Sequence, residues 1–291
     1  MTAWTHDFTL PIMAPADRIF RALTTPSELA TWFAEHVEME PRVGGPFRFW
    51  GKHTVGAPSE AEADGKVIAF TPGRSIGFTW RVLGVPSTVT LTVVPDENGA
   101  RVAVKHELSG PLDQPRPKEL IDDWWRFATG NLMVYTMEHG AVMRPDFADS
   151  HPEIRVVTYV KAPPSTVFRA LIDPALLRQW MGATEHAAVD AREGGTWDLG
   201  WRYKVDGKEV APPPHRILEF VENERFTIEW PDWRGDVSMP KQRVTWQLAP
   251  DGDGTTVSLI HAGFTRTVDL SDYPFGWGHF NSELGRVAAT L

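Results

Sequence analysis

The segment Ile12–Trp32, IMAPADRIFRALTTPSELATW, occurs a second time at Val160–Trp180 as VKAPPSTVFRALIDPALLRQW. The two segments start 148 residues apart and are identical at nine of 21 positions. The shared residues include prolines, apolar residues of the kind found in protein cores, and a tryptophan at the end of each segment. Agreement of this density indicates that the chain contains one unit twice.

The repeat continues along the whole chain, with a spacing that drifts from 148 to 155 residues. A period this long indicates a tandem domain duplication and not a solenoid, whose repeats are about 20–50 residues. We expect the first domain at residues 1–140, a proline-containing linker at 141–153 and the second domain at 154–291. Further matched pairs are Gly44/Gly194, Trp80/Trp230, Pro95/Pro250, His106/His261, Trp125/Trp277 and Leu132/Leu284.

Composition excludes several classes of protein. The chain has no cysteine, so disulfides, thiolate catalysis and thiolate metal sites are excluded. A net charge of −9 without a stripe of Lys and Arg argues against nucleic-acid binding. Neither a signal peptide nor an apolar run of roughly 18 residues is present, which predicts a cytoplasmic protein without a membrane span.

Each copy has the same predicted order of elements. A strand comes first, and two short helices follow, the second beginning at Thr25-Pro26 or Asp173-Pro174, where an N-cap residue precedes proline. Segments with period-two alternation then predict five or six antiparallel strands. A long helix with an apolar stripe ends each copy, over 117–139 in the first.

In its motifs, each copy resembles the START-related helix-grip superfamily (SRPBCC). Within it, both are similar to the branch named for the activator of the heat-shock-protein-ninety ATPase. The resemblance rests on FRALTTPSELATWF and FRALIDPALLRQWM, the Gly-Gly turns, the strand histidines and the tryptophan that opens each last helix. It implies an α+β fold of two tandem helix-grip domains, each a curved antiparallel sheet wrapped around its long C-terminal helix.

The resemblance implies a ligand-carrying protein. Members of the superfamily, many of them bacterial, bind lipids, sterols or polyketides between sheet and helix. We therefore expect a hydrophobic or aromatic small molecule as partner, with no cofactor and no metal. The alternatives are an enzyme of the polyketide cyclase, dehydratase or hydrolase type, and a co-chaperone-like interaction module. The fused pair would act as an intramolecular pseudo-dimer.

Two histidines are the best candidates for catalysis. His106 and His261 share a strand face with apolar residues, so each is expected to point inward, where it could act as a general acid or base. The favoured interpretation is that each instead forms a hydrogen bond that fixes the fold.

The tryptophans are the other candidates, because the chain has 13 Trp but only 4 Tyr. Core packing explains Trp32 and Trp180, whereas core packing and ligand stacking are equally good interpretations of the tryptophans on strands. Copy two has more aromatic residues, so we expect it to be the binding copy if only one binds. The ligand-binding candidates are Trp50, Trp80, His106, Trp125, Trp197, Trp201, Trp230, Trp246, His261 and Trp277.

Overall fold

The computed structural model describes residues 4–205, 207–236 and 239–291. It confirms the predicted α+β class, since each copy combines an antiparallel sheet with two short helices and one long C-terminal helix. The elements follow the predicted order in each copy. Copy one has six strands after its short helices, as predicted, but the described part of copy two has eight where five or six were predicted.

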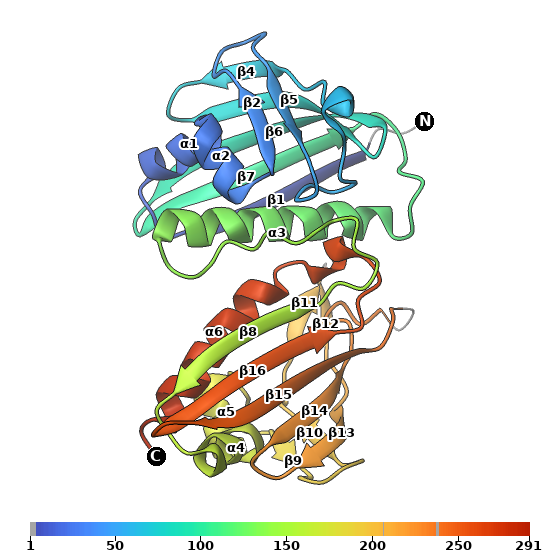
Figure 1. The fold of residues 1–291 in the computed structure, drawn as a ribbon. Coiled ribbons are helices and arrows are strands. Elements are labelled where there is room, and N and C mark those ends of the chain that lie inside the picture. The colour runs from blue at the N-terminus through green and yellow to red at the C-terminus, as the bar shows by residue number, and fades with distance from the viewer. Residues whose placement is uncertain (1–3, 206, 237–238) are drawn as a thin grey trace. The chain divides into compact units, whose positions relative to one another are not determined.

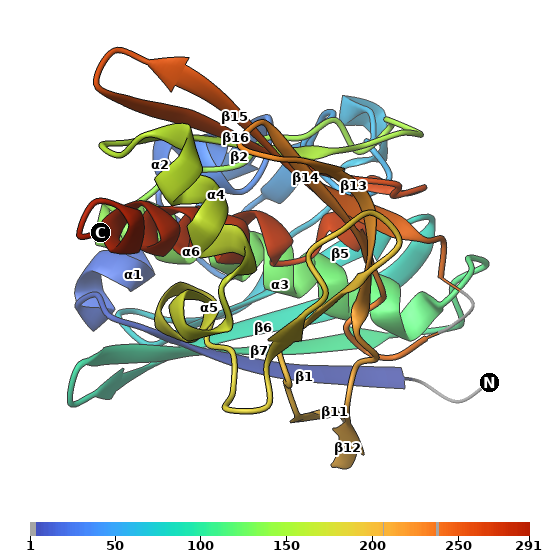
Figure 2. The ribbon, with the colours of Figure 1, turned by 90° about the horizontal axis from the view of Figure 1, so that it is seen from below.

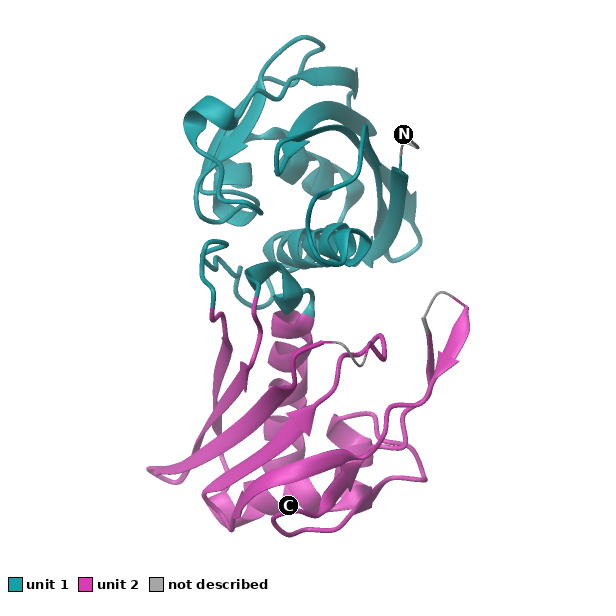
Figure 3. Cartoon of the chain, turned by 90° about the vertical axis from the view of Figure 1, so that its right-hand side faces the viewer, with its two compact units in different colours: residues 1–150, 266–272 teal, residues 151–265, 273–291 magenta. Residues whose placement is uncertain are grey.

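The chain divides into two compact units (Figure 3). Unit 1 comprises residues 1–150 and 266–272, and unit 2 comprises residues 151–265 and 273–291. The segment 266–272 thus belongs to unit 1 although it lies inside the second sequence repeat, and the repeat pattern gives no sign of this.

Unit 1 has a five-stranded antiparallel sheet in the order β1-β7-β6-β5-β4 and a separate β2-β3 ribbon. The long helix α3 runs beside β1 (Figure 1). The elements of unit 1 are β1 (Trp4–Ile12), α1 (Ala16–Thr24), α2 (Pro26–Trp32), β2 (His36–Met39), β3 (Phe47–Trp50), the 3₁₀ turn η1 (Glu60–Glu62), β4 (Val67–Thr71), β5 (Ser75–Val82), β6 (Val85–Asp96), β7 (Gly99–Leu108) and α3 (Pro117–Met137).

Unit 2 has a seven-stranded sheet in the order β8-β16-β15-β14-β13-β10-β9 and a β11-β12 ribbon. The long helix α6 contacts β8, α4 and α5 (Figure 2). The elements of unit 2 are β8 (Ile154–Val160), α4 (Pro164–Ile172), α5 (Pro174–Trp180), β9 (Ala188–Val189), β10 (Thr196–Asp198), β11 (Tyr203–Val205), β12 (Lys208–Val210), β13 (His215–Val221), β14 (Arg225–Trp230), β15 (Gln242–Asp251), β16 (Gly254–Ala262) and α6 (Tyr273–Ala288).

Prolines set the starts of the short helices, because proline has no N–H to leave unpaired in a first helical turn. Both α2 and α5 have proline at their first position. The caps differ from the prediction in one respect. Asp173 accepts a hydrogen bond from the Ala175 N–H at 2.8 Å, whereas Thr25 forms no capping hydrogen bond through its side chain.

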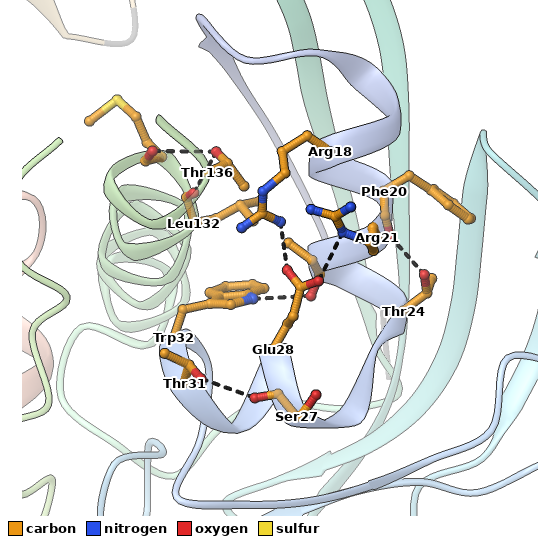
Figure 4. Close-up of polar contacts among 12 residues, drawn as sticks. Arg18, Phe20, Arg21, Thr24, Ser27, Glu28, Thr31, Trp32, Leu132 and Thr136 are labelled. Carbon is orange, nitrogen blue, oxygen red and sulfur yellow. Dashed lines mark hydrogen bonds and ion pairs between the residues drawn. The ribbon is translucent and has the colours of Figure 1, made fainter. Parts of the chain in front are cut away.

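The repeated tryptophan joins the two short helices of each unit. Trp32 Nε1–H donates to the Ala22 carbonyl at 3.1 Å (Figure 4), and Trp180 donates to the Ala170 carbonyl at 2.9 Å. Unit 1 adds an ion pair, in which the Glu28 carboxylate accepts hydrogen bonds from Arg18 and Arg21 (Figure 4). The opening sequence motif therefore encodes a helix pair whose indole N–H is satisfied by a carbonyl in the neighbouring helix.

The segment 266–272 lies against α3 within unit 1, and its residues Thr267–Leu270 form the 3₁₀ turn η2. The Asp269 carboxylate is buried and accepts a hydrogen bond from Arg116 at 2.8 Å and others from Arg266. Thr267 donates to the Asp146 carbonyl at 2.8 Å. The bonds of Asp269 with Arg116 and of Thr267 with Asp146 connect positions more than 100 residues apart in the sequence.

Candidate functional site

The two strand histidines occupy equivalent places, one in the interior of each unit. His106 on β7 and His261 on β16 are fully buried, and each lies on the same strand face as apolar residues, as the alternation predicted. Trp125 Nε1–H donates to His106 Nδ1 at 3.1 Å, and Trp277 Nε1–H donates to His261 Nδ1 at 2.9 Å. The repeat has thus kept a histidine and a tryptophan that are bonded to each other.

This pairing fixes the tautomer of both imidazoles. An indole nitrogen only donates, so Nδ1 of each histidine is the acceptor and Nε2 carries the proton. His106 Nε2 then donates to Ser87 Oγ at 2.9 Å, and Ser87 Oγ donates to the Trp80 carbonyl at 2.7 Å. In unit 2, His261 Nε2 donates to Gln242 Oε1 at 2.9 Å.

Both histidines are therefore neutral, and both ring nitrogens of each one form a hydrogen bond. Burial away from water lowers the pKa of His106 to about 3, and burial alone does the same for His261. Neither imidazole offers a ring nitrogen to a substrate in this arrangement. The geometry favours the interpretation that they fix the fold over their use as a general acid or base.

The predicted tryptophans of unit 1 lie in two places. Trp80 stacks on His106 with ring centroids 5.2 Å apart, and Trp125 meets the same imidazole edge-on. Trp50 is not part of this group, because it lies on the strand face opposite Phe49 and stacks on His36 instead.

An open hollow of about 600 Å³ adjoins this histidine cluster in unit 1. Trp80 and Ser87 line it together with Asp64 and Arg81, which form an ion pair at 3.1 Å.

A tryptophan that sequence reasoning missed fills much of the unit 1 interior. Trp124 on α3 is fully buried and packs its ring against Phe33, Trp80 and Phe147. Its counterpart on α6, one residue before Trp277, is Gly276. Gly276 is part-exposed, and a Cβ added there would meet no atom within 4 Å, so no side chain packs at this position of α6.

In unit 2 the structure brings five of the predicted residues together. Trp277 lies 5.0 Å from Trp230 and 5.8 Å from Trp246 between ring centroids, with His261 at 5.8 Å. Trp197 joins them at 6.0 Å from Trp246. These side chains form a continuous aromatic interior between the sheet and α6.

Trp201 is half-buried beside this interior. Its ring meets Trp230 edge-on at 6.3 Å and lies 6.4 Å from Phe280 on α6. Its Nε1–H donates to the Gly182 carbonyl at 3.0 Å, which fixes the ring in place.

Three polar atoms in the unit 2 interior have no hydrogen-bond partner among the described residues. They are Nδ2 and Oδ1 of Asn281 and Nε1 of Trp246. Asn281 is only 1% exposed and lies one helical turn after Trp277 on α6. A buried polar group without a partner typically costs about 1–3 kcal/mol, so native proteins keep few of them.

The equivalent positions of unit 1 have no such unpartnered groups. Thr129, four residues after Trp125, donates to the Trp125 carbonyl at 2.6 Å. Leu91 replaces Trp246 and has no polar side-chain atom. Unit 1 does have isolated unpartnered atoms elsewhere, namely Nε1 of Trp124, Oγ1 of Thr54, Nε2 of His6 and Oγ of Ser271.

A third buried histidine, His215 at the start of β13, was also missed as a site candidate. Its ring stacks on Trp230 at 4.6 Å with an interplanar angle of 13°, and it is tilted against Trp197 at 5.6 Å. Gly65 occupies this position in copy one. The sequence signal for His215 is therefore a difference between the two repeats and not a residue that they share.

Trp80 and Trp230 occupy matched positions but stack on different histidines. Trp80 stacks on His106, whereas Trp230 stacks on His215 and meets His261 edge-on at 6.1 Å. Both copies thus have a tryptophan at this strand position, but in copy two it stacks on a different histidine.

Two further results concern metals and membranes. Among the described residues, no group of three or more His, Asp or Glu side chains is placed to hold a metal ion. In the same part of the chain, every helix is too short or too polar to cross a bilayer.

The family model described as Activator of Hsp90 ATPase homolog 1-like protein matches residues 13–136 and again 161–289. The chain belongs to this family. Both of its copies are therefore domains of the same kind, as the residues shared by the repeats predicted. No curated protein matches the chain.

Several solved structures are similar to this family member. DynU16, a protein of the dynemicin biosynthetic locus, is 18% identical over 98% of both chains, with a TM-score of 0.42. CalU16 from Micromonospora echinospora is 26% identical over 48% of this chain and 77% of its own, with a TM-score of 0.37. The Aha1 dimer from Colwellia psychrerythraea is 19% identical over 47% of this chain and 96% of its own, also with a TM-score of 0.37.

Proposed function

We propose that the protein binds a flat, largely apolar small molecule in the interior of copy two, between the sheet and α6. The observation that carries this proposal is the amide of Asn281, which is buried without a hydrogen-bond partner among the described residues. A ligand that offers a donor and an acceptor to this amide would remove the cost of its burial.

The surroundings of Asn281 support an aromatic ligand. Trp277, one turn earlier on the same helix, contacts Trp230 and Trp246, and the indole N–H of Trp246 is also unpartnered. Aromatic rings prefer offset-stacked or edge-to-face neighbours, and such pairs add about 0.5–1.5 kcal/mol beyond their buried area. A planar ligand would gain both kinds of contact here.

The differences between the copies support copy two as the binding copy. At two positions where copy one has Leu91 and an internally bonded Thr129, copy two has the polar atoms of Trp246 and Asn281. At a third, the filled volume of Trp124 is replaced by Gly276. Each difference removes packing or adds unpartnered polar groups, as a ligand site would require.

Native mass spectrometry of gently purified protein tests the proposal. We expect a small-molecule adduct that denaturation removes, present in the wild type and in the control Thr129→Val but absent in Asn281→Leu. A panel of planar aromatic compounds, added to the purified protein, should raise the unfolding temperature of the wild type. Bare wild-type protein that no compound of the panel stabilises would overturn the proposal, as would an adduct that Asn281→Leu retains.

A further inference from the structure

The hydrogen bonds of the three buried histidines leave one ring nitrogen without a partner. His106 and His261 each use both nitrogens, as described above. His215 places Nδ1 3.2 Å from the Glu229 carbonyl oxygen. Its Nε2 forms no hydrogen bond within the described residues and is not among their fully buried unpartnered atoms, so a water-sized group can reach it.

The Glu229 contact fixes the tautomer of His215. A carbonyl oxygen only accepts, so Nδ1 carries the proton and Nε2 presents its lone pair. This is the reverse of the tautomer in His106 and His261. Burial lowers the pKa of His215 to about 4, although the Glu229 carbonyl and the Asp198 carboxylate act in the opposite direction. The imidazole is therefore neutral near pH 7, and Nε2 accepts hydrogen bonds but donates none.

The ring is also held rigidly. Trp230 covers one face of the imidazole at 4.6 Å, Trp197 lies against it at 5.6 Å, and the ring is 5% exposed. Trp230 in turn contacts Trp277, so His215 borders the same aromatic interior. A preorganised acceptor at the edge of an apolar site discriminates strongly between ligands that carry a donor and ligands that lack one.

We propose that Nε2 of His215 accepts a hydrogen bond from a hydroxyl group of the ligand, and that the protein thereby selects planar aromatic ligands that carry a phenol-type O–H. This inference rests on the proposed function and adds the chemical class of the ligand. It assigns His215 a role in ligand specificity that neither of the repeated histidines can take.

Three matched probes test the inference on the full-length chain: 2-naphthol, 2-methoxynaphthalene and naphthalene. Dissociation constants from ligand-observed NMR titrations should be about tenfold lower for 2-naphthol than for the other two, which corresponds to about 1.4 kcal/mol for one hydrogen bond. His215→Phe keeps a ring on Trp230 but removes the acceptor, so in this variant 2-naphthol should bind no more tightly than 2-methoxynaphthalene or naphthalene. His186→Ala, which changes a histidine with a 72% exposed side chain, is the control and should behave as the wild type.

The outcomes separate this inference from the proposed function. Equal binding of the three probes to the wild type would overturn the role of His215 but leave ligand binding intact. A 2-naphthol preference that persists in His215→Phe would do the same. Binding of none of the probes to the wild type would overturn both.

A second measurement does not depend on the folding of His215→Phe. Long-range ¹H–¹⁵N spectra of the wild type should show His215 as the Nδ1–H tautomer, with an Nε2 resonance that moves when 2-naphthol is added. An Nε2 resonance that does not move would contradict the inference.

Discussion

Trp125 and His106 lie on different elements of unit 1, and the indole N–H of the first donates to Nδ1 of the second at 3.1 Å. Trp277 and His261 repeat this bond in unit 2 at 2.9 Å. The partners of Nε2 differ, because Ser87 accepts in unit 1 and Gln242 accepts in unit 2. The repeat has therefore kept the bond that joins the last helix to the sheet while the second partner has changed.

His106→Phe should destabilise unit 1 by about 2–3 kcal/mol, because it leaves the buried Trp125 N–H without an acceptor. Urea denaturation measures the free energy of unfolding. The double variant His106→Phe/Trp125→Phe removes both partners and should lose less than the sum of the two single changes. Strict additivity would show that the bond contributes nothing to stability.

Acidification should destabilise the protein between about pH 6.5 and pH 3. Burial depresses the pKa of His106 and of His261 to about 3, so the unfolded chain binds protons in this range while the folded protein does not. The contribution of these histidines to the free energy of unfolding is fully present above the pKa that they have in the unfolded chain. It decreases as the pH falls, by about 1.4 kcal/mol per pH unit for each histidine. Urea midpoints measured from pH 7 to pH 4 test this, and His106→Phe should reduce the slope by about one proton.

Asn281→Leu should stabilise the ligand-free protein by about 1–3 kcal/mol, because it replaces an unpartnered buried amide with an apolar side chain of similar size. Thr129→Val in unit 1 is the matched change at a satisfied position and should have little effect. Differential scanning calorimetry of the ligand-free protein distinguishes the two. A loss of stability in Asn281→Leu would indicate that the amide has partners in the folded protein.

Gly276→Ala should raise stability by about 0.5–1 kcal/mol, since glycine inside a helix is unfavourable and nothing lies within 4 Å of the added Cβ. Trp124→Ala, at the matched position of α3, should instead cost about 3–5 kcal/mol because it empties a filled core. Thermal unfolding of the two variants measures this contrast. If Gly276→Ala is destabilising, the space at this position is smaller than the structure shows.

Asp269→Asn should destabilise unit 1 by about 1.5–3 kcal/mol, because the two arginines lose their hydrogen bonds to a buried charged carboxylate. Hydrogen exchange followed by mass spectrometry resolves the effect by peptide, and peptides from α3 should exchange faster while those from α6 do not. Asp272→Asn is the control, since the Asp272 side chain is 49% exposed and its ion pair with Arg126 is weak. Equal effects of the two substitutions would mean that burial of Asp269 is unimportant.

Much of the fold could be predicted from the sequence because its signals are local. Proline at the first helical position marks α2 and α5, and the apolar stripe predicted a helix over 117–139 where α3 covers Pro117–Met137. Alternation placed His106 and His261 on the inner strand face.

The site depends on partners that the sequence pattern does not specify. The tautomer of a buried histidine depends on atoms of other elements, such as the Glu229 carbonyl beside His215. Whether a buried amide has a partner depends on such atoms too. Shared residues drew attention to the histidines that fix the fold. Of the positions at which the copies differ, Trp246 was predicted as a candidate, whereas His215 and Asn281 were not.

The position of segment 266–272 also bears on the evolutionary history of the chain. A duplicated gene can ordinarily lose one copy and return to the ancestral form. Here Asp269 is encoded in the second repeat but is bonded to Arg116 in unit 1, and unit 1 is incomplete without it. Deleting the second repeat would remove the buried carboxylate that pairs with Arg116, so the first repeat alone would lack part of its folded unit.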